Sequence, residues 1–547
     1  MTWWWHFIGG RVHSVSHVTR REWNWVIVVS ALVVAASTLP YVAGYLAQTT
    51  QARFGGALVD QTDYYSHLAK MWQGYRGQWR YRLLFTPEAH PGVYLQTFYV
   101  ALGHFARLFG LGLPLTYQIA RVVFGFLMLM VVYCFIAYFV APVRTRRVAF
   151  LLATTASGLG WLVELCTPTS LNGISPIDFW LLDGFTYLAV LTFPHFCAAT
   201  ALLLVVFLLL LHRPDGPGLR EGMLAGLASL ALGLIHPYTL LLADLLPALY
   251  WTIGGLRTRW GPRRGLVTVA LMGGAQVPLL AYVLWIFRTQ PVFVGWSAQN
   301  VTLSPPLRVY LWGYGVLLVL GTIGVVVWMR RGRPGLAFPL LWLGLVALLV
   351  YLPWNLQRRF LEGVPVPLGL LAGVGLAEGL LPHGEGGRPA RNRRLLAVVI
   401  ALAAMSNLYL TAGLSLMAAT RMPAMFWPAD LLVAVDWLGE HSDWDETVLA
   451  AFETGSLIPA RIGHQVVLGH WMETVNFEAK RAAVAQFYVM DTPNAARLAL
   501  VRTWNVGWVF YGPQEQALDG FNPAAIAWLE PAFQRGDVMI YQVRDWP

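Results

Sequence analysis

The apolar residues of this chain come in long runs, and these runs constrain its fold more than any other feature. A membrane-spanning helix needs about 20 mostly apolar residues, and eleven apolar segments are predicted as spans. The short pair on either side of His236-Pro237 is alternatively one broken helix. Only 12% of the 547 residues are charged, whereas soluble domains carry about 25%. A soluble multidomain enzyme and a disordered protein are therefore excluded, and the predicted fold class is an all-α polytopic membrane domain of about 11 transmembrane helices. The predicted spans are 23–47, 114–140, 147–165, 190–212, 222–236, 238–254, 265–288, 306–329, 335–353, 361–381 and 395–418.

The arginines predict the orientation of these spans. They cluster in alternate loops, while the loops 166–189 and 289–305 contain neither arginine nor lysine. Positively charged short loops stay on the cytoplasmic side. We therefore expect a multi-pass protein of the cell (plasma) membrane with a cytoplasmic N-terminus, residues 1–22, and an extracytoplasmic C-terminus. The net charge of +10 comes largely from these loops, so no nucleic acid partner is expected.

One further apolar segment, Val93 to Gly110, decides on which side of the membrane all later loops lie. Counting it as a span would add one crossing and invert them. It contains His104 and Arg107 and is only 18 residues long. If it crossed the membrane, the arginine cluster at 144–147 would lie outside. We therefore interpret it as an interfacial helix on the outer surface.

The predicted domain organisation has three parts. Residues 1–22 are the cytoplasmic N-terminus, and residues 23–418 are the transmembrane domain, in which 48–113 is the first extracytoplasmic loop with interfacial helices. Residues 419–547 alternate helical and β-rich patterns and predict an extracytoplasmic α/β domain. Its predicted helices are 428–440, 477–487 and 495–504, and its predicted strands are 447–452, 465–468, 506–511 and 538–543.

Two aspartates in the first outer loop, Asp60 and Asp63, are the main candidates for chemistry. They are three residues apart at the expected start of a helix and therefore share one helix face. Carboxylates grouped beside a membrane suit a general base or a cation site. The alternative is that one of them only caps the helix.

A second group of polar residues stands at the predicted outer ends of the spans: Arg121, His195, His236, Arg358 and Arg359. Ionisable groups at membrane depth are costly and usually face a cavity or a functional path, although each alone could be an interfacial or snorkelling residue. Arg358 and Arg359 also stand on the predicted outer side of the membrane, although arginines usually gather in cytoplasmic loops. Because arginine binds phosphate through two parallel hydrogen bonds, a lipid-linked phosphate would explain them.

These features resemble the GT-C superfamily of polyprenyl-phosphate-sugar-dependent glycosyltransferases. The resemblance is to the bacterial protein O-mannosyltransferase-like branch and its uncharacterised prokaryotic members. It covers most of the chain through architecture, and each short motif is weak alone. The motifs are Asp60-Gln-Thr-Asp63-Tyr64, His90-Pro-Gly-Val-Tyr94 with Leu102-Gly-His104, Phe193-Pro-His195-Phe196, His236-Pro-Tyr238-Thr239, Gln357-Arg-Arg-Phe360, Thr454-Gly-Ser-Leu-Ile-Pro459 and Gly469-His470-Trp-Met-Glu473-Thr474.

The resemblance implies a hexosyltransferase that moves a sugar from a polyprenyl phosphate to an acceptor hydroxyl at the outer face of the membrane. Asp60, slightly favoured, or Asp63 would be the catalytic base. Arg358 and Arg359, with Arg121, His195 and His236, would hold the donor phosphate. The acceptor could be a protein, a lipid or a glycan. Its contacts would come from Tyr64, His67, Glu88, His90, His470 and Glu473.

The sequence departs from the Asp-Glu pair of the mannosyltransferase branch and has Asp-x-x-Asp instead. This departure leaves open which aspartate is the base. It also leaves open whether Asp60 and Asp63 hold a divalent cation, since members of the superfamily differ in metal dependence.

Two other functions are compatible with a polytopic chain. A membrane transporter or lipid flippase also needs intramembrane charges, but it often shows paired inverted repeats, and no such pairing is evident here. A non-catalytic membrane scaffold or sensor would tolerate Asp60→Asn and Asp63→Asn.

Overall fold

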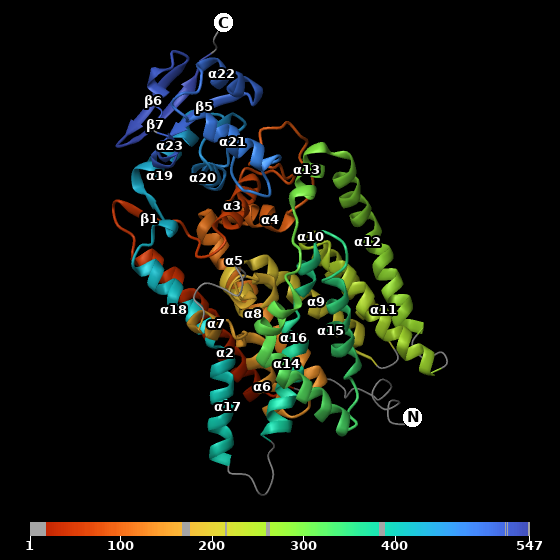
Figure 1. Ribbon diagram of the computed structural model, residues 1–547. Helices are drawn as coiled ribbons and strands as arrows, with labels where there is room; N and C mark the ends of the chain where they lie inside the picture. The colour runs from red at the N-terminus through yellow and green to blue at the C-terminus, as the bar shows by residue number, and fades with distance from the viewer. Residues whose placement is uncertain are drawn as a thin grey trace. The chain divides into compact units, whose positions relative to one another are not determined.

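The structure is a computed structural model that describes residues 18–166, 175–213, 216–258, 263–381, 389–519, 521 and 523–544 (Figure 1). Most of these residues are helical. The chain divides into two compact units. Unit 1 comprises Met1–Leu39, Ala120–Ala281 and Thr302–Leu414, and unit 2 comprises Pro40–Ile119, Tyr282–Val301 and Ser415–Pro547. The predicted boundaries at 22 and 418 stay predictions, and residues 1–17 of the expected N-terminus lie outside the described residues.

Helices occupy each of the eleven ranges predicted as spans. Among the described residues, five helices are long and apolar enough to cross a membrane, and two bent pairs raise the number to seven if each pair is one span. The protein is therefore a multi-pass membrane protein, while eleven crossings and their orientation stay a prediction. The five are α2 (Arg20–Leu46), α5 (Leu113–Phe139), α9 (Pro194–Leu211), α12 (Arg263–Thr289) and α14 (Leu307–Arg330), and the bent pairs are α6 (Val143–Thr155) with α7 (Gly160–Cys166) and α17 (Pro389–Ala403) with α18 (Met405–Ala419).

The other helices of unit 1 are shorter. They include three apolar stretches of 10 to 17 residues: Thr239–Gly254, Ala337–Leu349 and Pro365–Leu380. The set comprises η2 (Ile177–Phe179), η3 (Leu182–Gly184), α8 (Thr186–Thr192), α10 (Leu219–Ile235), α11 (Thr239–Thr258), α15 (Ala337–Leu349), η4 (Gln357–Leu361), α16 (Pro365–Val374) and η5 (Gly375–Leu380).

Small residues bring the central helices of unit 1 together. A Cβ atom added to Gly324 of α14 would lie 1.9 Å from the Leu371 carbonyl oxygen of α16. Added to Gly373 of α16, it would lie 2.4 Å from the Cα of Ala149 in α6. Close backbone approach through small residues is the usual way in which membrane helices gain packing energy.

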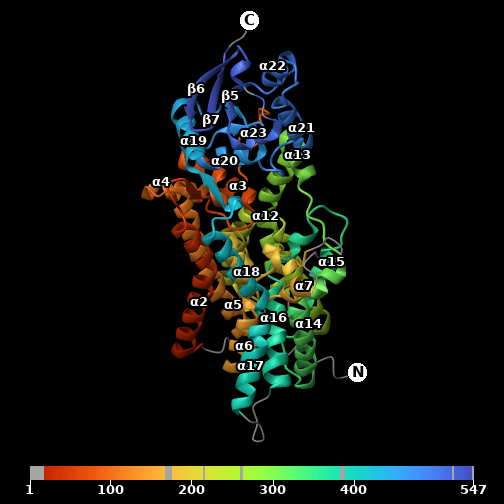
Figure 2. The ribbon, with the colours of Figure 1, turned by 60° about the vertical axis from the view of Figure 1, so that its left-hand side comes forward.

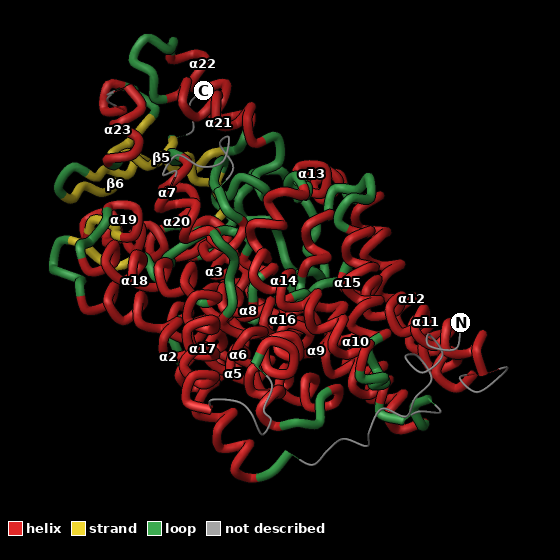
Figure 3. The backbone as a smooth tube through the Cα atoms, turned by 60° about the horizontal axis from the view of Figure 1, so that its bottom comes forward, coloured by secondary structure: helices red, strands yellow, loops and turns green. Residues whose placement is uncertain are grey.

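Unit 2 combines the first loop with the tail, and every strand of the described chain belongs to it (Figure 3). From the loop come β1 (Ala52–Phe54), α3 (Gln61–Tyr75) and α4 (Thr97–Phe109), and α13 (Pro291–Gln299) follows α12. From the tail come η6 (Pro423–Met425), β2 (Phe426–Pro428), α19 (Ala429–His441), β3 (Thr447–Leu449), α20 (Phe452–Ile462), β4 (Gln465–Val466), α21 (Phe477–Phe487), α22 (Asn494–Thr503), β5 (Val506–Tyr511), α23 (Pro513–Asp519), η7 (Pro523–Ala525), β6 (Leu529–Arg535) and β7 (Val538–Val543).

The tail forms a five-stranded sheet in the order β4-β3-β5-β7-β6 (Figure 2). Strands β3, β4 and β5 are parallel, and β7 is antiparallel to both β5 and β6. The strands predicted at 506–511 and 538–543 and the helix predicted at 477–487 have these bounds in the structure. Helix α20 and strand β6 were not predicted.

Strand β1 of the first loop pairs with β2 of the tail, so the two segments share backbone hydrogen bonds as well as a core. Ala52 is opposite Pro428, and Phe54 is opposite Phe426 in an antiparallel register. The Trp72 indole N–H of α3 donates to the Ala460 carbonyl of α20 at 2.9 Å. These contacts fix α3, which carries the candidate carboxylates, against the tail.

Helix α4 covers most of the segment expected at the membrane interface. Its 13 residues are too few to span a bilayer. One face is buried through Tyr99 and Val100, while Leu108 and Phe109 on the other face are exposed. An apolar exposed face suits an interfacial helix, and its place at the membrane surface stays a prediction.

Candidate functional site

Asp60 stands at the N-terminus of α3 in a strained backbone conformation. Its φ and ψ are 51° and 55°, in the left-handed region, and its side chain makes no capping hydrogen bond. The residue is exposed. Non-glycine residues in this region cost about 1–3 kcal/mol and cluster at functional sites. The capping alternative for Asp60 is therefore wrong, and the strain is consistent with a functional role.

Asp63, one turn further along α3, contacts a histidine of the tail. The Nε2 atom of His470 lies 2.6 Å from Oδ1 of Asp63. The Nδ1 atom of His470 accepts the backbone N–H groups of Met472 and Glu473, both at 3.2 Å. A ring that accepts at Nδ1 holds its proton on Nε2, so His470 donates to Asp63. This bond orients the Asp63 carboxylate.

Electrostatics reinforce this pair. Burial lowers the pKa of His470, but the hydrogen bond and charge of Asp63, with the charge of Glu473, outweigh it and raise the pKa above its ordinary value. The side chain of Asp63 is 29% exposed and that of His470 is 3% exposed. The carboxylate therefore has one side on the protein and one side accessible.

A buried ion pair stands behind His470. Oε1 of Glu473 accepts the Ser66 hydroxyl at 2.6 Å and lies 2.9 Å from the ammonium nitrogen of Lys70. Oε2 accepts the Tyr81 hydroxyl at 2.7 Å. All four residues are at most 3% exposed. Burial raises the pKa of Glu473, but the charges of Lys70 and His470 prevail and lower it. The carboxylate thus stays charged and fully bonded.

The second lysine of the chain is also buried against a carboxylate. Lys480 lies 2.6 Å from Oε1 of Glu88 and donates to the Thr86 hydroxyl at 2.8 Å. Burial lowers the pKa of Lys480, and Glu88 opposes this shift. Both lysines of the sequence therefore hold the first loop to the tail, and the acceptor contact expected of Glu88 stays a prediction.

The remaining candidates of unit 2 are packed among neighbours. His90 Nε2 accepts the Leu83 N–H at 3.0 Å and Nδ1 lies 2.7 Å from the Glu88 carbonyl, so backbone groups engage both ring nitrogens. Burial lowers the pKa of His90. The ring of His67 stacks on Tyr99 with centroids 4.0 Å apart. Tyr64 is buried, and its ring meets the Tyr117 ring edge-on at 4.9 Å.

In unit 1, a carboxylate that sequence reasoning missed organises His236. Nδ1 of His236 lies 2.9 Å from Oε2 of Glu362, which also accepts the Thr239 hydroxyl at 3.0 Å. Glu362 is 1% exposed. Because Nδ1–H donates to the carboxylate, Nε2 is the ring nitrogen that can meet a ligand. The His195 ring lies edge-on to His236 with centroids 5.0 Å apart.

One of the two predicted arginines of η4, Arg359, lies near these histidines. Arg359 is 3.2 Å from Oδ2 of Asp183, and its guanidinium lies 5.9 Å from the centroid of Phe196, whose ring also contacts His195 and His236. The guanidinium of Arg358 lies 5.1 Å from the ring centroid of Trp180. Unit 1 thus brings Arg359, His195 and His236 together around one phenylalanine.

Arg121 has a different environment. It is fully buried and donates to the Val190 carbonyl at 3.0 Å, to the Ser37 hydroxyl at 3.1 Å and to the Thr38 hydroxyl at 2.9 Å. These bonds link α2, α5 and α8. A structural role in joining these helices accounts for them.

The donor set does not fit a metal held by protein side chains alone. Within the described ranges, no three His, Cys, Asp or Glu side chains form a group that could hold a metal ion. Asp63, one of the two expected ligands, is already hydrogen-bonded to His470.

Sequence reasoning missed five residues of these networks: Ser66, Lys70, Tyr81, Asp183 and Glu362. For three of them a signal existed. Ser66 and Lys70 follow Asp63 by three and seven residues, which is the spacing of one helix face. Glu362 is a carboxylate within an apolar predicted span, where ionisable residues are costly.

Comparisons with known proteins identify the fold of the chain. No family model matches the sequence. A curated protein, haem exporter protein B of Rhodobacter capsulatus, is 34% identical over 118 residues, which are 20% of this chain and 54% of that protein. The chain thus spans about half the length of the curated relative it matches.

Solved structures are similar over nearly the whole chain. Arabinofuranosyltransferase AftD from Mycobacteria has a TM-score of 0.58 at 15% identity, over 97% of this chain and 40% of that one. ArnT from Cupriavidus metallidurans, bound to undecaprenyl phosphate, has a TM-score of 0.53 at 13% identity, over 96% and 98%. An Archaeoglobus fulgidus oligosaccharyltransferase, tethered with an acceptor peptide, has a TM-score of 0.50 at 14% identity, over 96% and 74%. The fold that the sequence resemblance implied is thereby confirmed: the chain has the fold of the GT-C glycosyltransferases.

Proposed function

We propose that this protein is a membrane glycosyltransferase that moves a sugar from a polyprenyl-phosphate donor to an acceptor hydroxyl at the outer face of the membrane. The observation that carries the proposal is the network on α3, where Asp63 is fixed by His470 beside the exposed Asp60. A GT-C fold supports it, since ArnT has this fold and was solved with undecaprenyl phosphate. The sugar, hexose or other, is open, and so is the class of acceptor.

Asp60 is the favoured general base. Its carboxylate is exposed, whereas Asp63 is engaged by a buried histidine. The base takes the proton of the acceptor hydroxyl, and the resulting oxygen attacks the anomeric carbon as the bond from that carbon to the phosphate oxygen breaks. Attack in line inverts the configuration of the sugar. Asp63 orients the hydroxyl, and His470 keeps Asp63 in place.

The departing phosphate needs positive charge and hydrogen-bond donors. Arg359 and Arg358 supply both through their guanidinium groups. His236, whose Nδ1–H donates to Glu362, can donate from Nε2 only as the imidazolium. Donors aimed at the charge that develops on a leaving group are usually the largest contribution to catalysis. Arg121 and His195 are positioning residues in this proposal.

A donor-consumption assay tests the proposal. Protein reconstituted in vesicles is given a panel of undecaprenyl-phosphate sugars with membrane extract as acceptor, and free undecaprenyl phosphate is measured. Arg359→Ala should raise the KM for the donor at least tenfold. Arg481→Ala, at a 59% exposed side chain paired with Glu478, should leave the KM unchanged. Equal KM values for both variants, or no consumption of any donor, would contradict the proposal.

The transporter and scaffold alternatives receive less support. The match to the haem exporter covers 20% of the chain, whereas the matches to glycosyltransferase structures cover 96–97%. The scaffold alternative predicts that Asp60→Asn and Asp63→Asn leave the function of the protein intact. The orientation is tested separately, since a tag fused after Pro547 should be accessible from outside intact cells.

A further inference from the structure

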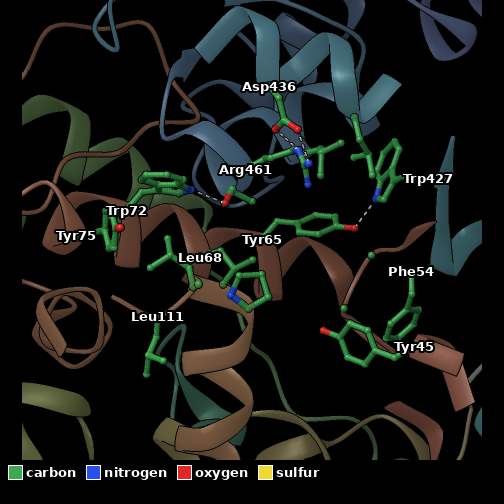
Figure 4. A pocket seen from close by; sticks show the side chains of 18 of the residues that line it. Tyr45, Phe54, Tyr65, Leu68, Trp72, Tyr75, Leu111, Trp427, Asp436 and Arg461 are labelled. Atoms are coloured by element: carbon green, nitrogen blue, oxygen red, sulfur yellow. Dashed lines mark hydrogen bonds and ion pairs between the residues drawn. The ribbon is translucent and has the colours of Figure 1, made fainter. Parts of the chain in front are cut away.

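Unit 2 contains a cavity that the proposed reaction does not use. Its volume is about 460 Å³, within the range of small-molecule sites (Figure 4). It is lined by α3, by the tail helices α19 and α20, by β2 and by the ends of α2 and α5. The side chains that characterise it are Tyr45, Tyr65, Trp72, Tyr75, Trp427 and the Asp436–Arg461 pair.

The cavity lies on the opposite side of α3 from Asp63. Asp63 and Lys70 are seven residues apart and share one helix face, which meets the His470 and Glu473 loop. Tyr65 and Trp72 are also seven residues apart, and the two-residue offset places them on the opposite face. The cavity is therefore a second site and not an extension of the first.

Hydrogen bonds hold the aromatic planes in place. The Trp427 indole N–H donates to the Tyr65 hydroxyl at 2.6 Å, and the Trp72 indole N–H donates to the Ala460 carbonyl at 2.9 Å. Figure 4 shows both bonds at the cavity. Rings fixed in this way lose little conformational entropy when a ligand stacks on them.

The charged side chains of the cavity, Asp436 and Arg461, form an ion pair that has no net charge. Nε and one terminal nitrogen of Arg461 lie 2.5 and 2.6 Å from the two carboxylate oxygens of Asp436. The side chains of Arg461 and Asp436 remain 35% and 46% exposed. Since the two charges already compensate each other, the pair does not favour an anion. It offers donors and acceptors to an uncharged polar ligand.

We infer that this cavity binds a neutral saccharide. Pyranose rings present apolar faces, which stack on aromatic planes, and hydroxyl groups at their rims, which hydrogen-bond to a carboxylate and a guanidinium. A hydrocarbon chain would remove water from Asp436 and Arg461 without replacing its hydrogen bonds, at a free-energy cost. The structure therefore favours a glycan over a lipid chain as the occupant.

Saturation-transfer NMR on the full chain tests the inference. The protein is placed in phosphatidylcholine nanodiscs, since detergents with sugar headgroups would compete. The probes are methyl α-mannopyranoside, methyl β-glucopyranoside and maltotriose. At least one should give saturation transfer, and Tyr75→Ala and Trp427→Ala should each weaken it at least fivefold. Trp79→Ala, at a 51% exposed tryptophan outside the cavity, should not change it.

Each contrary result overturns the inference. These are an absence of transfer from all three probes, or a signal that persists in both cavity variants. A signal that disappears in Asp63→Asn but not in Tyr75→Ala would assign the sugar to the transfer site instead. A failure of the proposed reaction alone would leave binding at the cavity intact, so the two proposals are distinguishable.

A lipid occupant has its own signature. In nanodiscs with brominated phosphatidylcholine, chains inside the cavity would quench Trp427, which is measured as the difference between wild type and Trp427→Phe. The inference expects no such difference in quenching, and a clear difference would overturn it. Melting temperatures close to that of the wild type show that the variants are folded.

Discussion

His470 Nε2 and Asp63 Oδ1 are 2.6 Å apart although 407 residues separate them in the chain. The bond joins the tail to the helix that carries both candidate carboxylates. It also fixes which way one of them points. The tail of this protein is therefore connected to the chemistry proposed for the first loop.

Loss of this bond should lower turnover more than donor affinity. In His470→Phe the ring volume is kept, but Asp63 has no donor, so we expect kcat to fall about tenfold or more with little change in donor KM. His470→Gln can donate from nearly the position of Nε2 and should recover part of kcat. Steady-state kinetics measure both values. Wild-type kcat in the phenylalanine variant would contradict a positioning role.

The buried Lys70–Glu473 pair should behave as a unit. Removal of one partner leaves an uncompensated charge, so Glu473→Gln or Lys70→Met alone should cost about 3–5 kcal/mol. The double variant leaves no unpaired charge and should be more stable than the sum of the single effects predicts. Thermal unfolding in detergent measures the coupling. Additive losses would mean that the two side chains do not interact.

The same pair predicts a dependence of stability on pH. Although burial raises the pKa of Glu473, Lys70 and His470 hold it below its ordinary value of 4.5. For a carboxyl whose folded pKa is depressed, the stabilising contribution is complete above the ordinary value and is lost as the pH falls through the folded one. The melting temperature of the wild type should therefore drop below about pH 4.5, and that of Glu473→Gln should drop less. Parallel curves would count against the ion pair.

Close packing of α3 on α4 predicts which glycines are required. A Cβ on Gly74 would lie 1.9 Å from the Val100 carbonyl oxygen, and one on Gly103 would lie 2.0 Å from the Met71 carbonyl oxygen. Both obstacles are backbone atoms, so the helices must separate. This loss should outweigh the helix propensity of about 1 kcal/mol that alanine adds. Gly112→Ala, where nothing lies within 4 Å, is the matched control. We expect lower melting temperatures only for the first two variants.

Local sequence patterns predicted most of the helices and strands. Apolar runs marked the helices of unit 1, and β-rich runs predicted the bounds of strands β5 and β7. The prediction failed for β1 and β2, three-residue strands that exist only because they pair across the chain. It also failed for α20, whose Gly455 and Pro459 obscure the helical pattern.

The sequence pointed to individual residues of the site but not to the contacts between them. Asp63, His470 and Glu473 each stood out as polar groups, yet no local spacing relates residues hundreds of positions apart. Glu88 and His90 were equally conspicuous. The structure shows their contacts with Lys480 and with backbone groups, and their acceptor contact stays a prediction. Whether the carboxylates of unit 2 and the arginines of unit 1 act on one substrate stays a prediction.

The most direct measurement separates donor binding from transfer in one variant. Asp60→Asn with Asp63→Asn keeps the size of both side chains and removes the base. The account predicts that this variant binds undecaprenyl phosphate with wild-type affinity in vesicles, while sugar transfer falls about 10²- to 10⁴-fold. Transfer at the wild-type rate would contradict it.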